Sequence, residues 1–208
     1  MWMGRETGIV IIHVAMAATS ESVDSSFMAK VTTGTGDTGY TSLLGEQRVP
    51  KYDARPDTFG TVDEATSALG LARAVTRNAR AQEIILQMQR DLYVLMAELA
   101  TPPENLQSVG LQITAEQVQW LETIEEELKA EVTIPNKFII PGDSQDGAAL
   151  DLARTIIRRA ERMTVRLLHD GVTLNGELVR YLNRLSDVVF ILARYLEAGQ
   201  GGSTEARP

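Results

Sequence analysis

The stretch Leu150-Asp-Leu-Ala-Arg-Thr-Ile-Ile-Arg-Arg-Ala-Glu-Arg-Met-Thr-Val-Arg166 decides the fold. Its apolar and small residues recur at spacings of three and four, namely Leu150, Ala153, Ile157, Ala160 and Thr164. This period predicts an α-helix with one face buried against other elements. Five arginines also fall within thirteen residues of it, although the whole chain carries a net charge of −8.

The arginines of this predicted helix follow a pattern of their own. Arg154, Arg158, Glu161 and Arg162 lie at positions i, i+4, i+7 and i+8, so they share one face. Clustered cations repel one another unless something negative lies among them. One interpretation is a solvated face balanced by neighbouring acids. The other is a polyphosphate site, because guanidinium groups bind phosphate oxygens and a carboxylate holds Mg²⁺. The helix alone leaves both open.

Composition limits the chemistry of the chain. With 208 residues and 44% hydrophobic residues, it can bury one core, and its length favours one domain. The acidic balance argues against binding to nucleic acid or to an anionic membrane surface. The absence of cysteine excludes disulfides and thiol nucleophiles, and the only imidazoles are His13 and His169. An enzyme built from this chain therefore depends on positioning and electrostatics.

The two ends differ from the middle. Residues 8–18 are apolar but too short to span a bilayer. We interpret residues 1–29 as an N-terminal extension to the domain: residues 1–27 are either disordered or upstream of a true start at Met28. A cleaved signal peptide is the remaining alternative. Residues 199–208 are rich in Gly and Ser, so we expect a disordered tail. The domain is then 30–198.

Four further helices are predicted from periodicity and capping signals. Two early helices start at Gly60 or Thr61 and at Ala81, and end near residues 75 and 99. Thr114-Ala-Glu-Gln117 is a capping box for a helix to about residue 131, and Asn175-Gly-Glu begins the last one. Together with the arginine helix and the absence of a strand signal, they predict an all-α fold, a five-helix antiparallel bundle.

Two irregular segments stand out between these helices. In residues 33–41 glycines alternate with threonines, which is typical either of a flexible linker or of a backbone nest for phosphate oxygens. No Gly-Lys-[Ser/Thr] closes it, so it is not a Walker A loop. The segment Thr133–Asp143 is too apolar for an exposed loop. Its Phe138 either plugs the end of the bundle or packs against a ligand.

Six motifs occur in an order that resembles a known family. They are Thr33-Gly-Thr-Gly-Asp-Thr-Gly-Tyr-Thr41, Arg48-Val-Pro-Lys51, Gly60-Thr-Val-Asp-Glu64, Phe138-Ile-Ile-Pro-Gly142, Ala153-Arg-Thr-Ile-Ile-Arg-Arg-Ala-Glu-Arg162 and Tyr181-Leu-Asn-Arg-Leu-Ser-Asp187. Over about residues 30–197 the chain resembles the PduO-type ATP:cob(I)alamin adenosyltransferases. The resemblance implies a cytoplasmic homotrimer with active sites between subunits. Its implied reaction transfers the 5′-deoxyadenosyl group of ATP to the cobalt of cob(I)alamin, releasing triphosphate. It also raises the possibility of delivery to an adenosylcobalamin-dependent enzyme.

The resemblance also implies roles for individual residues. ATP binding falls to Thr33, Gly34, Thr35, Gly36, Thr41, Ser42, Lys51, Arg158, Arg159, Glu161, Arg162 and Asn183. Arg158, Glu161 and Phe138 are the implied catalytic residues, with Glu161 on Mg²⁺ and Phe138 against the lower face of the corrin. Asp63 and Arg154 are implied to pair across a subunit interface.

The chain departs from the family pattern at four positions. Gly34 stands where the family usually has Lys or Arg, Thr32 where it has Tyr, Thr66 where it often has Asn or Ser, and Asp143 where it often has Gly or Ser. Two other function classes remain open at this point. One is a cobalamin carrier that uses ATP as a release switch, and the other is a structural helical protein whose arginines form salt bridges between copies.

Overall fold

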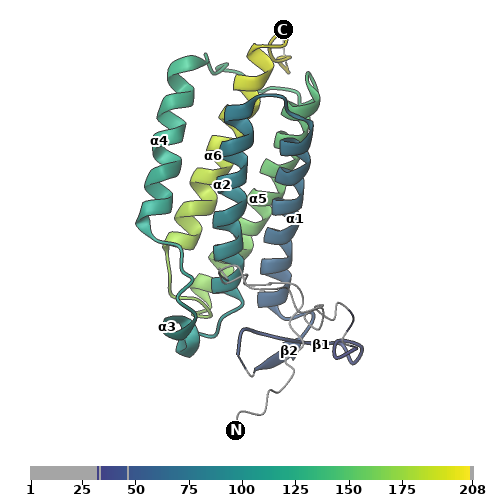
Figure 1. Cartoon of the computed structure of the whole chain (residues 1–208), viewed down its shortest axis with the longest axis vertical. Coiled ribbons are helices and arrows are strands. Elements are labelled where there is room, and N and C mark those ends of the chain that lie inside the picture. Colours follow the sequence, from purple (N-terminus) through teal and green to yellow (C-terminus); the bar gives the residue numbers. More distant parts are fainter. Residues whose placement is uncertain (1–31, 33, 46, 207–208) are drawn as a thin grey trace, which may run out of the picture.

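The computed structural model describes residues 32, 34–45 and 47–206 of the chain. The predicted extension 1–29 and the predicted ATP ligand Thr33 therefore lie outside the described residues. The fold is mostly helical, and long helices run side by side along one axis (Figure 1). Two short strands lie at one end of this bundle.

The helices and strands follow one another in a simple order. The elements are β1 (Tyr40–Ser42), β2 (Arg48–Pro50), α1 (Ala54–Val75), α2 (Ala79–Leu99), a 3₁₀ turn (Pro103–Asn105), α3 (Leu106–Val109), α4 (Ala115–Glu131), α5 (Gln145–His169) and α6 (Glu177–Ala198). The helix α5 packs against α1 and α6, and α6 also packs against α4 and α2. Successive long helices point in opposite directions along the bundle (Figure 1).

Helix α1 begins earlier than the sequence predicted. The start at Gly60 or Thr61 is wrong, because Asp53 caps the helix by accepting a hydrogen bond from the Arg55 N–H at 3.0 Å. Pro56 lies in the first turn, where its missing N–H costs nothing. Asp63 consequently lies in the interior of α1 and not in its first turn.

Helices α4 and α6 start at the predicted signals. The Thr114 N–H donates to Gln117 Oε1 at 2.9 Å, which completes the capping box of α4. At the start of α6, Asn175 Oδ1 accepts from the Glu177 N–H at 3.0 Å. Helix α5 begins five residues before the predicted stretch, because the Ser144 hydroxyl oxygen accepts from the Gly147 N–H at 3.0 Å.

The core is formed by the predicted apolar stripes. All five residues of the α5 stripe are buried, and so are Leu178, Leu182, Leu185, Val189, Leu192 and Leu196 of α6. In α2 the stripe consists of Ile84, Ile85, Met88, Leu92, Leu95, Met96 and Leu99, and all are buried apart from Met96, which is partly buried. Burial of one stripe per helix is the reason that these helices pack into a bundle instead of staying separate.

An ion network lies inside this core near the end of α6. Arg194 is 2% exposed and donates to Asp151 Oδ2 at 2.6 Å and to Glu197 Oε2 at 2.7 Å. Both acceptors are also buried, so their charges depend on Arg194. Removing one partner of such a network leaves uncompensated buried charge, at a cost of about 3–5 kcal/mol.

The small sheet departs from the all-α prediction. β1 and β2 pair antiparallel, with Thr41 opposite Val49 and Ser42 opposite Arg48. Each strand has three residues, which is too short for a period of two to be visible in the sequence. The expectation of no strand was therefore wrong, and part of the Gly/Thr segment forms a hairpin.

Candidate functional site

The polar face of α5 meets α6 through one carboxylate. Asn183 Nδ2 donates to Glu161 Oε1 at 3.0 Å, so two of the predicted site residues are in contact. Arg184 then donates to Asn183 Oδ1 at 2.9 Å and to Glu122 Oε1 of α4 at 3.1 Å. This chain of bonds fixes the orientation of Glu161 and Asn183 at the junction of three helices.

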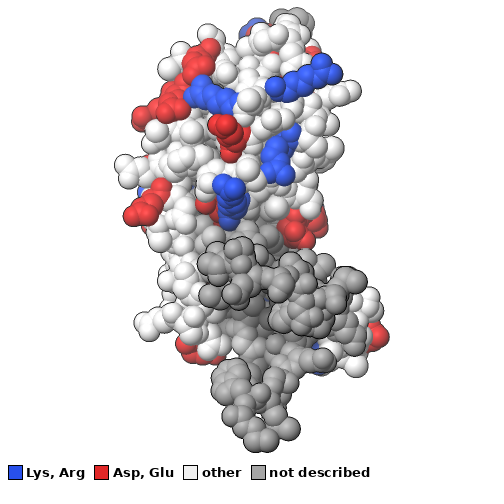
Figure 2. Space-filling view, viewed as in Figure 1, with Lys and Arg blue, Asp and Glu red and all other residues white. Residues whose placement is uncertain are grey.

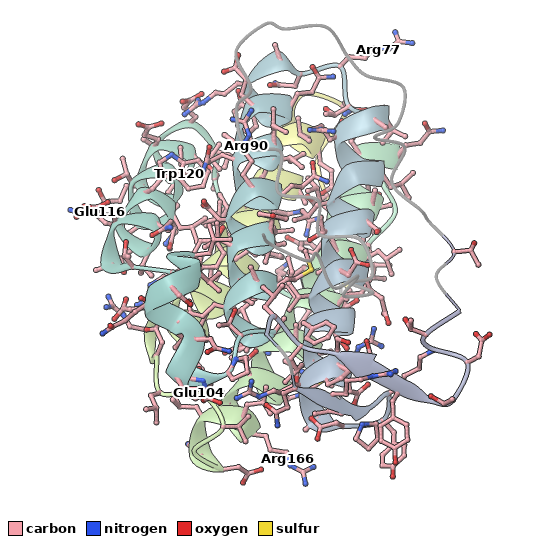
Figure 3. All side chains as sticks on the ribbon, turned by 60° about the horizontal axis from the view of Figure 1, so that its bottom comes forward. Arg77, Arg90, Glu104, Glu116, Trp120 and Arg166 are labelled. Atoms are coloured by element: carbon pink, nitrogen blue, oxygen red, sulfur yellow. The ribbon has the colours of Figure 1, made fainter. Side chains whose placement is uncertain are left out.

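The five arginines of α5 have different surroundings. Arg159 forms an ion pair with Glu64 of α1, and Arg166 forms one with Asp170, with 3.6 Å between Arg166 Nε and Asp170 Oδ2. The Arg166 side chain is 80% exposed and points away from the end of the bundle (Figure 3). Arg162 donates to the Arg158 carbonyl at 2.8 Å. Arg158 forms no ion pair with any residue that the structure describes. Neighbouring acids therefore account for only part of the positive charge.

Arg158 lines a groove of about 360 Å³ between α4, α5 and α6. Arg154, Lys129, Glu125 and Asp187 share this groove, whose apolar side consists of Ile134, Phe190 and Ile191. Burial, followed by the nearby charge of Glu125, raises the pKa of the Asp187 carboxyl. The groove thus combines an apolar wall with charges of both signs, which suits a large ligand with polar edges.

Two arginine side chains, those of Arg154 and Arg194, lie over the ring of Phe190. The Arg154 guanidinium lies 5.7 Å from the centre of the Phe190 ring, and the Arg194 guanidinium lies 5.0 Å from it. Arg154 also donates to Asp151 Oδ1 at 3.3 Å. The predicted partner of Arg154, Asp63, is exposed on α1 and forms no ion pair within the described residues.

The Gly/Thr segment is a compact series of turns. The Asp37 N–H donates to the Gly34 carbonyl at 3.3 Å and the Gly39 N–H to the Gly36 carbonyl at 3.1 Å. Gly34 has a φ of +72°, a conformation that other residues rarely adopt. A Cβ built on Gly36 would lie 3.0 Å from the Lys51 ammonium, so a side chain there would displace Lys51. Gly36 and Lys51, both predicted to bind ATP, are therefore neighbours.

Arg48 of β2 links the Gly/Thr segment to the small sheet through hydrogen bonds. Its guanidinium donates to the Thr35 carbonyl at 2.7 Å and to the Tyr40 carbonyl at 3.3 Å. No role for Arg48 was predicted from the sequence, although the residue lies between the glycines and Lys51. Thr41 and Ser42 lie on β1, where their side chains point to opposite faces of the sheet.

Phe138 lies in the segment between α4 and α5, at the end of the bundle opposite the sheet (Figure 1). Its ring is 90% exposed, and Ile140 is 51% exposed. The interpretation that Phe138 plugs the bundle end is therefore wrong for the isolated chain. Residues 204–206 lie alongside this segment, where the Ala206 N–H donates to the Phe138 carbonyl at 2.7 Å. The sequence prediction of a disordered tail did not anticipate such bonds.

Comparison with known proteins identifies the kind of protein that carries this arrangement. A profile of the cobalamin adenosyltransferase family matches residues 31–196. The chain belongs to the cobalamin adenosyltransferase family. A corrinoid adenosyltransferase of Citrobacter freundii is 40% identical over 170 residues, which are 82% of this chain and 96% of that protein. The corrinoid adenosyltransferase PduO of the same organism is 36% identical over 78% of this chain, but the match spans only 48% of the relative.

A solved adenosyltransferase structure has the same fold. It is a phenylalanine-to-alanine variant of a PduO-type ATP:corrinoid adenosyltransferase from Lactobacillus reuteri, complexed with cobalamin and ATP. Its TM-score is 0.78 at 33% sequence identity, and the match covers 86% of this chain and 100% of that chain. This likeness shows that the mostly helical fold described above matches that of a PduO-type adenosyltransferase.

Two negative findings concern the described part of this adenosyltransferase. None of its helices is both long and apolar enough to cross a bilayer. It also contains no cluster of three or more His, Cys, Asp or Glu residues placed to hold a metal ion. On the face shown in Figure 2, acidic and basic side chains are interspersed over the upper half of the bundle.

Proposed function

We propose that this chain transfers the 5′-deoxyadenosyl group of ATP to the cobalt of cob(I)alamin, forming adenosylcobalamin and triphosphate. The observation that carries the proposal is the family match over residues 31–196. Within that range α5 presents Arg158 beside the Glu161–Asn183 contact. The activity is that of a transferase acting on ATP and a corrinoid.

The chemistry suits a protein without cysteine. Co(I) is itself a strong nucleophile, so the protein needs no nucleophile of its own to attack C5′ of ATP. Its tasks are to align cobalt with C5′ and to stabilise the charge of the departing triphosphate. We assign the second task to Arg158, Arg162 and Lys51. Arg159 pairs with Glu64 in this chain, so its contact with ATP would require that ion pair to open.

We propose that the turns of the Gly/Thr segment bind the phosphates of ATP. Gly34, Thr35 and Gly36 form the turns, and Lys51 supplies the cation beside Gly36. Turns of this kind direct backbone N–H groups toward an anion. Thr33, Thr41 and Ser42 complete the set that the resemblance implies.

We propose that the carboxylate of Glu161 binds Mg²⁺. Its Oε1 accepts from Asn183, and among the described residues no partner contacts Oε2. One carboxylate together with phosphate oxygens and water is an ordinary Mg²⁺ site, so the residue set fits the ion. Bound there, Mg²⁺ would neutralise part of the triphosphate charge.

The proposed active form is a homotrimer built from the bundles of five long helices. Within one chain, the Gly/Thr segment and the segment between α4 and α5, which contains Phe138, lie at opposite ends of the bundle (Figure 1). Helix α5 has 25 residues and therefore spans about 37 Å. ATP and cobalt have to meet in the reaction, so we infer that neighbouring subunits supply the two parts of each site. Asp63 and Arg154 would pair across that interface.

Phe138 is proposed to occupy the lower face of the corrin. A ring that is 90% exposed in the isolated chain is available to a ligand. Expelling the axial base from cob(II)alamin makes reduction to cob(I)alamin easier. The product would then pass to an adenosylcobalamin-dependent enzyme, and we propose a cytoplasmic location, where ATP is available.

A visible absorption spectrum tests the activity. The protein is mixed anaerobically with ATP, Mg²⁺ and chemically reduced cobalamin, and the spectrum of adenosylcobalamin should develop over many turnovers. Arg158→Ala should slow this by about 100–1,000-fold, because it removes one charge-stabilising contact. Arg166→Ala is the matched control, since this side chain is 80% exposed beyond the groove. ATP binding without turnover would indicate a carrier, and no ATP binding would indicate a structural protein.

A further inference from the structure

Residues 202–206 form a short segment, here called the brace, beside Phe138. The Ile140 N–H donates to the Thr204 carbonyl at 2.9 Å, and the Ala206 N–H donates to the Phe138 carbonyl at 2.7 Å. Ile139 and Glu205 are opposite each other in an antiparallel bridge. The backbone is therefore held on both sides of Ile139, within one residue of the Phe138 ring.

Side chains reinforce these backbone bonds. Asp143 Oδ2 accepts from the Thr204 N–H at 2.6 Å, and Asp143 Oδ1 accepts from the Thr204 hydroxyl at 2.7 Å. The hydroxyl bond and then the backbone bond hold the pKa of the Asp143 carboxyl below its usual value. Lys137 forms an ion pair with Glu205. Asp143 and Lys137 thus bind the brace on either side of Phe138.

The other end of the brace is anchored in the core. The Gly202 N–H donates to the Glu197 carbonyl at 2.9 Å, and the Ser203 hydroxyl donates to the Glu197 carboxylate. Glu197 is fully buried and bound to Arg194, which also holds Asp151. The chain of contacts therefore runs from buried residues of α5 and α6 to the backbone of Phe138.

We propose that the brace positions Phe138 for the corrin, with Asp143 and Thr204 as positioning residues. The inference rests on the proposed role of Phe138. An exposed apolar ring on a mobile loop would lose conformational entropy when it binds. Here the backbone is held before any ligand arrives, which lowers that cost and keeps the ring in place for the lower face of the corrin.

The test uses full-length variants and two measurements. Amide hydrogen exchange at Ile140 and Ala206, without ATP or cobalamin, reports on the brace itself. The yield of four-coordinate cob(II)alamin in the presence of ATP reports on the position of Phe138. Asp143→Ala removes both side-chain bonds, Thr204→Val removes one, and Thr204→Ser retains the hydroxyl. Thr123→Val is the matched control, because its exposed hydroxyl bonds only to Gln119 of its own helix.

Asp143→Ala should accelerate exchange at Ile140 by about tenfold or more, because a charge-assisted pair of bonds is lost. The four-coordinate yield should fall with it, while the KM for ATP stays at the wild-type value. Thr204→Val should change both readouts in the same direction and by less. Thr204→Ser and Thr123→Val should match wild type. If Asp143→Ala does not fold, Thr204→Val alone decides the test.

Two results would overturn the proposal. Unchanged exchange in Asp143→Ala would mean that these bonds do not hold the segment. Faster exchange with a full four-coordinate yield would mean that the brace does not position the ring. A full yield in Phe138→Ala is a separate result: it would reject the role of Phe138 itself, whatever the exchange data show.

Discussion

Lys51 illustrates how the residues around a single side chain hold it in place. The Lys51 ammonium lies next to Gly36, and a larger residue at position 36 would displace it. The backbone N–H of Lys51 donates to the Gly39 carbonyl at 2.9 Å. The sequence identified Lys51 and the glycines as a possible phosphate site. It did not identify Arg48, because a guanidinium that bonds to two backbone carbonyls leaves no local pattern.

For Lys51→Ala we expect the KM for ATP to rise by about tenfold or more, since a charge-assisted contact to phosphate is lost. Affinity for cobalamin should change little. Steady-state kinetics with each substrate varied in turn measures both, and Lys51→Arg, which retains the charge, serves as the control. An unaltered KM for ATP in Lys51→Ala would remove this residue from the site.

Phe138→Ala provides a second test of a single residue. Because the ring is 90% exposed, its removal should change the free energy of unfolding by no more than about 0.5 kcal/mol. Turnover from cob(II)alamin should nevertheless be largely lost, whereas turnover from pre-formed cob(I)alamin should suffer less. Thermal unfolding combined with both activity assays separates these effects. A variant that is strongly destabilised but keeps its cob(II)alamin activity would show that Phe138 is structural.

At the scale of single elements, the helices were predictable because their signals are local. The capping box of α4 and the apolar stripe of α6 each involve residues within a few turns of one another. The start of α1 was missed because residues 48–55 are polar and contain a proline, which is typical of a connection, whereas Asp53 caps a helix that begins at Ala54, before the predicted start at Gly60. The contacts of the tail were missed because Asp143 and Thr204 are far apart in the sequence.

The packing of α2 on α6 includes a polar pair that responds to pH. Asp91 accepts from the Tyr181 hydroxyl at 3.1 Å and from Gln87 at 3.0 Å. Burial raises the pKa of Asp91, and burial together with the Asp91 charge raises the pKa of Tyr181 well above its usual value. The folded state therefore holds the Asp91 proton more tightly than the unfolded state. That contribution to stability is present below the unfolded pKa, near 4, and is lost as pH rises through the folded pKa.

Asp91→Asn should remove this loss of stability at higher pH, because an amide keeps the size of the carboxyl and does not ionise. The melting temperature of the variant relative to wild type should therefore increase as pH rises from about 4 to 7. Thermal unfolding across that range is the measurement. Glu83→Gln, an exposed acid on the same helix, is the control. If the wild-type and Asp91→Asn curves run parallel, Asp91 does not contribute to the pH dependence.

At the scale of the whole molecule, the predicted site residues fall into separate groups within one chain. The sequence indicated the Gly/Thr segment, the arginine helix and Phe138 as separate signals. The structure brings Glu161 and Asn183 together, and Gly36 and Lys51 together, while Phe138 lies at the other end of the bundle. The proposal that neighbouring copies complete the site comes from the resemblance, because contacts between copies would leave no periodicity in a sequence.

The interface is tested by Arg154→Ala. If Arg154 pairs with Asp63 of another copy, the substitution should cost about 3–5 kcal/mol, as for a buried ion pair that loses one partner. Sedimentation should then show weaker trimers, and activity should fall with them. The double variant Asp63→Asn/Arg154→Ala should be no worse than either single variant, because the same contact is removed. Strictly additive effects, or wild-type sedimentation of Arg154→Ala, would argue against the pair.

The position of α6 in the bundle has a consequence for biosynthesis. This helix is the last in the order of elements, yet it packs against α2, α4 and α5, and Arg194 near its end neutralises Asp151 of α5. A nascent chain that has exposed α1 to α5 can pack α1 against α2 and α5, but it still lacks the surface against which α4 packs and the cation that one buried acid needs. We therefore expect the core to close only after residue 198 has left the ribosome. Until then the emerging helices depend on chaperones to avoid aggregation.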